Sequence, residues 1–193
     1  KKKKILLIQN KALELSFFLS LPATITLAIG SEQIISALFG YGSFDKISVK
    51  NSSLALHYFA LGLPAFALIK VFSSFFFANH DTKTPFYISL ISVMLNIFIS
   101  VYYFNQIGFI IIPIATSISS WFNSIILFIF LKNRGLFFFN EIFFVKFIKI
   151  IVATILMGLF FKFLLNYFQY ELGFNQGIKS LYLILSVVLG LSF

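Results

Sequence analysis

The stretch Asn79-His80-Asp81-Thr82-Lys83-Thr84-Pro85 is a short polar connector between two long apolar segments. Residues 52–78 before it contain one formal charge, Lys70, and residues 86–131 after it contain none. A helix needs roughly 20 mostly apolar residues to cross a bilayer, and each flank provides them. The connector therefore predicts two membrane helices that reverse direction within a few residues.

The composition of the whole chain favours the same class of protein. Of its 193 residues, 60% are hydrophobic and only 11% are charged, and the mean hydropathy is +0.98. Soluble domains average roughly 25% charged residues, so this chain lacks the polar side chains that would cover a water-exposed surface. We therefore predict an integral membrane protein.

Several function classes do not fit the residue types present. The chain has no Cys, and its two His residues, His57 and His80, lie in different segments. No nucleophile stands with a base and no pair of carboxylates is visible, so we predict no catalytic residue, no metal, no cofactor and no enzyme activity. A net charge of +9 would suggest nucleic acid in a soluble protein. Here the basic residues cluster at the ends of apolar segments, as topology signals do, and nucleic acid is not an expected partner.

Six apolar segments have the length of membrane spans, the last only in part. We predict an all-α, polytopic membrane helix bundle with about six transmembrane helices, at residues 13–29, 53–77, 86–104, 108–131, 143–165 and 178–193. Pro22 lies inside the first span, Pro64 is expected to kink the second, and Pro85 stands in the first turn of the third. Apolar residues at helical spacing over residues 32–39 predict a short amphipathic helix at the interface, with Ser31 as its N-cap.

The distribution of Lys and Arg predicts the orientation of these spans. Four basic residues fall on one side, namely Lys46, Lys50, Lys162 and Lys179. Ten fall on the other, namely Lys1, Lys2, Lys3, Lys4, Lys11, Lys83, Lys132, Arg134, Lys146 and Lys149. Because cytoplasmic loops are enriched in Lys and Arg, we predict that the N-terminus and the 79–85 connector are cytoplasmic.

Three polar residues within the spans are candidate substrate-binding residues. Lys70 carries the only charge deep in a span, and an ionisable residue inside a membrane is a functional-site hypothesis by default; the alternative is that it extends to the nearby membrane surface. Asn96 and Asn123 lie near the middles of adjacent spans, where hydrogen bonding between helices is the main interpretation and substrate contact the second. Small and hydroxyl residues around them predict that these two helices pack inside the bundle.

The main interpretation of the two charged residues in the connector is structural. Asp81 and Lys83 are most simply loop charges that cap helix ends and fix topology. The alternative is a conformational latch, in which Asp81 pairs with a basic residue on a neighbouring loop.

Several local patterns, in this order, resemble the C-terminal half of the lipid II flippase family (MurJ/MviN). They are Leu21-Pro22-Ala23, Leu38-Phe39-Gly40-Tyr41-Gly42-Ser43-Phe44, Ala60-Leu61-Gly62-Leu63 with Lys70-Val71, and Phe77-Ala78 followed by the connector. The positions that match the family, together with the helix-kinking Pro64, are interpreted as conformational or topological: Pro22, Gly42, Phe44, Pro64, Lys70, Asp81, Lys83, Thr84 and Pro85.

The resemblance implies a protein of fourteen helices in the multidrug/oligosaccharidyl-lipid/polysaccharide exporter superfamily. Residues 1–134 would supply four spans of the C-terminal lobe, and residues 135–193 two additional helices, the last truncated. Since the chain has no initial Met and ends inside an apolar run, we expect the N-terminal lobe to be missing from it. The implied partners are lipid II, membrane lipids and that lobe; the implied location is the bacterial inner membrane.

The implied activity is transfer of the undecaprenyl-pyrophosphate-linked peptidoglycan precursor from the cytoplasmic to the periplasmic leaflet by alternating access. Alternatives from the same superfamily are a flippase for O-antigen or capsular lipid-linked repeats, and a multidrug/cation antiporter. A membrane enzyme or structural membrane subunit is the alternative from another class. The family's cavity arginines lie mostly outside the chain, whose single Arg is Arg134.

Overall fold

A computed structural model describes residues 2–174 and 176–192, and these residues form helices and connecting loops. The helices, in chain order, are α1 (Lys2–Ile29), α2 (Ser31–Phe39), α3 (Lys46–Ala78), α4 (Lys83–Ile107), a 3-10 turn (Gly108–Ile110), α5 (Ile111–Asn133), α6 (Glu141–Tyr167) and α7 (Lys179–Ser192). No strand occurs among the described residues. The predicted all-α class is confirmed.

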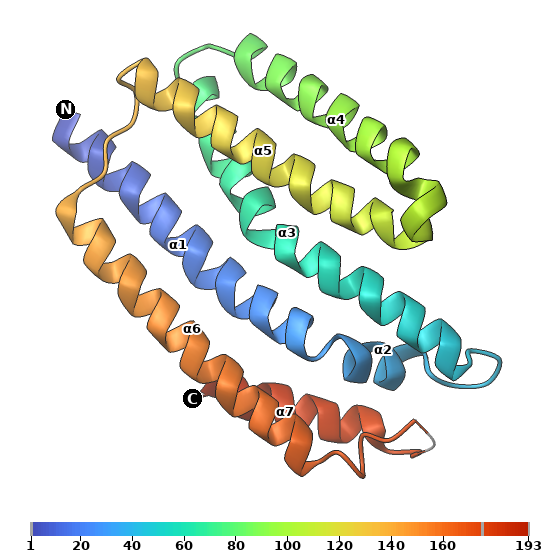
Figure 1. The fold of residues 1–193 in the computed structure, drawn as a ribbon. Coiled ribbons are helices and arrows are strands. Elements are labelled where there is room, and N and C mark those ends of the chain that lie inside the picture. Colours follow the sequence, from blue (N-terminus) through green and yellow to red (C-terminus); the bar gives the residue numbers. More distant parts are fainter. Residues whose placement is uncertain (1, 175, 193) are drawn as a thin grey trace.

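The long helices lie side by side in one bundle, and long helices that follow one another in the chain run in opposite directions (Figure 1). Helix α3 packs against both α1 and α5, α4 packs against α5, and α6 packs against α1. Helices α2 and α7 contact each other at one end of the bundle. The connector between α3 and α4 and the loop between α5 and α6 lie at the opposite end.

The first five predicted spans each coincide with a long helix. Four apolar stretches of the described residues are long enough to cross a membrane, at 7–29, 46–78, 83–133 and 142–167. The third of these contains both α4 and α5, which turn back on each other after Gly108, a residue with a φ of 74°. The sixth predicted span is present as α7, whose 14 residues are shorter than the roughly 20 that a full span needs.

Helix α1 begins at Lys2, so the first predicted span, 13–29, is the apolar part of a longer helix. Buried Gln9 and Asn10 donate to the main-chain oxygens of Leu136 and Phe138 and hold the earlier segment on the bundle. One local expectation was wrong. Ser31 is the first residue of α2, and the N-cap position is occupied by Gly30 without a side-chain cap.

Helix α3 changes direction about midway along its length (Figure 1). Pro64 lies inside it, and a proline removes one main-chain donor and clashes with the preceding turn. The predicted bend is therefore present.

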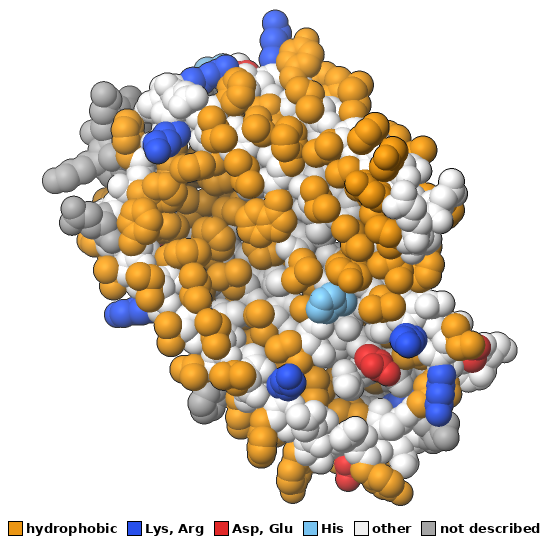
Figure 2. Space-filling view, viewed as in Figure 1, with side chains coloured by type: hydrophobic (Ala, Val, Ile, Leu, Met, Phe, Trp, Pro, Cys, Tyr) orange, Lys and Arg blue, Asp and Glu red, His pale blue; other side chains and the backbone are white. Residues whose placement is uncertain are grey.

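The core of the bundle is aromatic and aliphatic where α1, α3 and α5 meet. Its buried members include Leu13, Leu68, Phe72, Phe76, Leu127 and Leu131. Apolar side chains also cover much of the face drawn in Figure 2. Elsewhere on the helices Leu19, Phe98, Val101, Leu159 and Ile184 are all more than half exposed. A soluble protein rarely exposes a continuous apolar surface of this kind, so the surface fits contact with lipid.

Candidate functional site

The connector begins where α3 ends in a tight, hydrogen-bonded turn. His80 has a φ of 60°, the left-handed conformation. Its amide donates to the Phe77 oxygen at 3.0 Å, and the Asp81 amide donates to the Phe76 oxygen at 3.0 Å. These are the two bonds of a Schellman motif, which close α3 and direct the chain toward α4.

Asp81 caps the start of α4 from within the connector. Its carboxylate accepts the Thr84 amide at 3.0 Å and the Thr84 hydroxyl at 2.6 Å. Pro85 follows in the first turn and is buried, where a residue without an N–H is tolerated. Lys83 is exposed. The connector therefore ends one helix and starts the next within four residues, 79–82.

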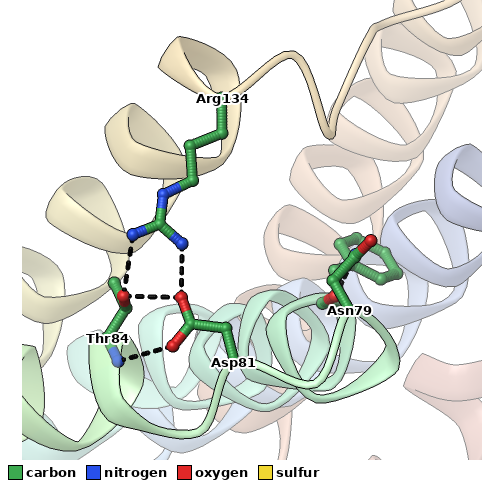
Figure 3. Close-up of polar contacts among 5 residues, drawn as sticks. Asn79, Asp81, Thr84 and Arg134 are labelled. Carbon is green, nitrogen blue, oxygen red and sulfur yellow. Dashed lines mark hydrogen bonds and ion pairs between the residues drawn. The ribbon is translucent and has the colours of Figure 1, made fainter.

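Arg134 joins this connector to the loop after α5 (Figure 3). Its guanidinium forms an ion pair with the Asp81 carboxylate and also donates to the Thr84 hydroxyl at 3.0 Å. It lies 5.6 Å from the centre of the Phe76 ring, within the range of a cation–π contact. The pairing of Asp81 with a basic residue on a neighbouring loop is therefore present in the structure.

The ionisation of Asp81 reflects these contacts. The Thr84 hydroxyl and amide, followed by the Arg134 guanidinium, hold the pKa of the Asp81 carboxyl well below its ordinary value of 3.8. Hydrogen bonds and a nearby positive charge favour the charged form of a carboxyl group. Asp81 is consequently a carboxylate at any neutral or mildly acidic pH.

Lys70 projects from α3 without a partner among the described residues. Its side chain is exposed, and neither of the ion pairs in the structure includes it. It lies eight residues before the end of α3 at Ala78. Lys70 therefore lies on an outer face of this chain.

Asn96 and Asn123 each bond across the contact between α4 and α5. The Asn96 amide donates to the hydroxyls of Thr116 at 3.1 Å and Ser119 at 3.3 Å. The Asn123 amide donates to the Ser89 hydroxyl at 3.3 Å. Hydrogen bonding between helices, the main interpretation of both residues, is present in the structure.

The small residues of α5 allow an equally close contact with α3. A Cβ added to Gly62 would come within 2.8 Å of the Ser117 hydroxyl and 3.3 Å of the Ser117 Cα. The Ser117 hydroxyl donates to the main-chain oxygen of Tyr58 at 2.5 Å, and the Trp121 ring N–H donates to the main-chain oxygen of Leu61 at 3.0 Å. Helices α3, α4 and α5 therefore form one tightly bonded unit, as the composition of α5 predicts.

The remaining positions interpreted as conformational or topological lie away from the connector. Pro22 is inside α1 and Pro64 inside α3. Gly42 has a φ of 59° in the loop before α3, and the Phe44 ring lies 6.3 Å from that of Phe39. This loop is at the far end of the bundle from Asp81 (Figure 1), so the structure does not bring these residues together into one site.

Lys179 is a functional candidate that the sequence did not single out. Its side chain is fully buried, and its ammonium donates to the main-chain oxygens of Gly40 at 2.6 Å and Phe174 at 2.8 Å. It also lies 4.3 Å from the centre of the Tyr41 ring. Lys179 thus holds the start of α7 to the end of α2. Its partners are main-chain atoms, one of them 139 residues away, and leave no signal in the sequence.

An apolar cavity of about 240 Å³ opens between α1, α3, α5 and the start of α6. Its walls are mostly aromatic and aliphatic, with Phe17, Phe72, Trp121, Phe128, Phe139 and Phe143 among them. No group of three or more His, Asp or Glu side chains that could hold a metal occurs within residues 2–174 and 176–192. The cavity suits a hydrocarbon chain.

Comparison with protein families gives a match along almost the whole chain. The family described as "Lipid II flippase MurJ" matches residues 1–182. The "Probable lipid II flippase MurJ" of Rickettsia prowazekii is 40% identical over 116 residues, which are 60% of this chain and 23% of that protein. The protein of the same description from Thermotoga maritima is 37% identical over 158 residues, 82% of this chain and 32% of that protein.

A solved structure supports the fold independently. The structure titled "Lipid II flippase MurJ, inward closed conformation" superposes on 100% of this chain and 39% of its own, with a TM-score of 0.74 and 24% sequence identity. The chain spans only about a quarter of the length of the first curated relatives.

Proposed function

Because the chain belongs to the lipid II flippase MurJ family, we propose that it forms the C-terminal part of a flippase for lipid-linked peptidoglycan precursor. The family is one of transporters, and the continuous match over residues 1–182 is the observation that carries the proposal. The substrate is the undecaprenyl-pyrophosphate-linked precursor, which moves from the cytoplasmic to the periplasmic leaflet of the bacterial inner membrane.

In this proposal α3, α4 and α5 move as one body during alternating access. The hydroxyl and amide bonds across these helices, together with the Asp81–Arg134 pair, support such rigidity. Residues 1–134 contribute four spans to the C-terminal lobe, and residues 135–193 contribute two further helices. The N-terminal lobe of a longer chain and the surrounding lipids are the remaining partners.

The apolar cavity and the polar residues have separate proposed roles. The aromatic cavity of about 240 Å³ takes part of the polyprenyl tail. Lys70 is the candidate contact for an anionic group of the substrate, since it is the cation within the predicted span 53–77 and has no ion-pair partner among the described residues. Asn96 and Asn123 act first by holding α4 on α5, and a substrate contact by either is secondary.

In the proposed orientation the connector is cytoplasmic. A single Cys introduced at exposed Asn79 should react with a membrane-impermeant maleimide only in opened cells. A Cys at Ser43, in the loop at the far end of the bundle, should react in intact cells whose outer membrane is permeable. The reverse pattern would invert the proposed topology.

Depletion of the full-length protein in its host tests the function itself. Lipid II should accumulate on the inner leaflet, and its appearance on the outer leaflet should stop. A host in which lipid II export continues while an O-antigen or capsular repeat accumulates would refute the assignment. Parallel depletion of an unrelated enzyme of cell-wall synthesis controls for the effects of a general arrest of growth.

A further inference from the structure

A second, polar cavity of about 390 Å³ lies at the end of the bundle opposite the connector. Helix α2, the start of α3, the end of α6 and the following loop enclose it, with Glu32, Gln33, Ser36, Lys46, Gln169 and Phe174 on its walls. Its volume is that of a small-ligand pocket. None of its residues belongs to the proposed transport machinery.

Two polar atoms on its walls are buried without a partner. Ser36 is 6% exposed and its hydroxyl oxygen has no hydrogen bond; the side-chain oxygen of Gln33 is likewise buried and unbonded. Buried polar groups in folded proteins are nearly always paired. Gln33 offers an acceptor and Ser36 a hydroxyl, so these two atoms favour a ligand that donates hydrogen bonds into the cavity.

The two charged residues of the cavity are of opposite sign and do not pair with each other. The ion pairs among the described residues are Asp81–Arg134 and Glu14–Lys146, so Glu32 and Lys46 are left for other partners. Lys46 is the first residue of α3, where the helix dipole also favours an anion. The neighbouring Asp45 carboxylate is engaged in capping, by accepting the Ser48 amide at 2.8 Å. Glu32 and Lys46, whose ammonium lies 5.7 Å from the centre of the Phe174 ring, thus offer one negative and one positive charge, which suits a zwitterion.

The cavity is placed where a lipid headgroup would lie. Acidic and basic side chains gather at this end of the molecule, beside a largely apolar face (Figure 2). The exposed apolar side chains of Leu38, Phe39 and Ile47 stand on the same two helices, α2 and α3. An amphipathic helix with such a surface lies at the membrane interface, with acyl chains next to it.

We propose that this cavity binds the headgroup of a zwitterionic phospholipid with a primary ammonium, a phosphoethanolamine lipid of the surrounding membrane. Its phosphate faces Lys46, and its ammonium donates to Glu32 and to the unpaired oxygen of Gln33. Ser36 supplies a further hydrogen bond. The proposal goes beyond transport and does not depend on the flippase assignment.

Binding of defined lipids to the delipidated full-length protein, measured by native mass spectrometry, tests this site. Phosphatidylethanolamine should bind at least several-fold more tightly than phosphatidylcholine of the same chains, since trimethylation removes every ammonium donor. It should also bind more tightly than phosphatidylglycerol, which leaves Glu32 without a cation. Equal binding of the three lipids would overturn the proposal.

Variants locate the binding in this cavity. Glu32→Gln and Lys46→Gln should each remove the preference for phosphatidylethanolamine, whereas Glu171→Gln and Lys50→Gln, which change nearby charges that do not line the cavity, should keep it. All four should elute as the parent protein does in gel filtration. An unchanged preference in the first two variants would refute the site. If glycerophosphoethanolamine, the headgroup without acyl chains, binds as tightly as the lipid, the proposal that the ligand is a membrane lipid is refuted.

Discussion

Arg134 and Asp81 form an ion pair although 53 residues separate them in the sequence. Arg134 follows α5, and Asp81 lies between α3 and α4, so the pair connects the ends of three helices. The same Asp81 carboxylate caps α4 through Thr84. One side chain therefore serves both the local turn and the long-range contact.

Separate substitutions should distinguish these two roles of Asp81. Asp81→Asn keeps a side-chain acceptor for the Thr84 amide and loses the charge, whereas Asp81→Ala loses both. We expect the thermal unfolding midpoint of the full-length protein in detergent to fall slightly in Asp81→Asn and Arg134→Gln, and further in Asp81→Ala. Lys132→Gln, an exposed neighbour, is the control. Arg134→Gln should add little to Asp81→Asn, and full additivity would contradict a direct interaction.

The same contacts predict an acid dependence. Because the folded-state pKa of Asp81 is below its ordinary value of 3.8, its stabilising contribution is complete above that value and is lost as the pH falls toward the folded-state pKa. The difference in unfolding midpoint between the parent and Asp81→Asn should therefore be constant from about pH 7 to 5 and shrink below about pH 4. A difference that changes between pH 7 and 5 would implicate another group.

The sequence predicted the spans because each depends on local composition. Long apolar runs with few or no charges predict α3, α4, α5 and α6, and the connector between residues 79 and 85 predicts the reversal between α3 and α4. The apolar pattern marks only the later part of α1, since residues 2–12 are charged or mixed, and a contact of Gln9 with Leu136 holds that earlier part on the bundle. Lys179 was counted only among the basic residues that predict the orientation, and its burial was not expected. Long-range contacts with main-chain atoms leave no pattern in the sequence.

The close approach of α3 and α5 should not tolerate a side chain at Gly62. Gly62→Ala would place a Cβ 2.8 Å from the Ser117 hydroxyl and 3.1 Å from the Phe66 ring. Overpacking of this kind costs about 1–3 kcal/mol, which should appear as a lower unfolding midpoint. Gly177→Ala, where the added carbon meets no atom within 4 Å, is the matched control. Equal unfolding midpoints for the two variants would contradict the tight contact between α3 and α5 at Gly62.

Removal of the buried ammonium of Lys179 should also destabilise the protein. Lys179→Met retains the length of the side chain but leaves the Gly40 and Phe174 oxygens without their donor. An unpaired buried acceptor costs about 1–3 kcal/mol, and we expect protease cleavage in the loop between α6 and α7 to increase. The exposed Lys162 provides the control Lys162→Met. Unchanged cleavage in Lys179→Met would mean that α7 is held by its apolar contacts alone.

Lys70 offers the sharpest test of substrate contact within this chain. A hydrogen bond to a charged group contributes about 1.5–3 kcal/mol, so loss of such a bond in the transport step should lower the flipping rate by roughly tenfold or more. We expect Lys70→Ala in the full-length protein to impair rescue of a depleted host, whereas Lys70→Arg, which keeps the positive charge, should support growth. Protein levels in the membrane must match in both variants. If Lys70→Ala rescues as well as Lys70→Arg, the ammonium only extends to the membrane surface, and the headgroup contacts belong to other residues.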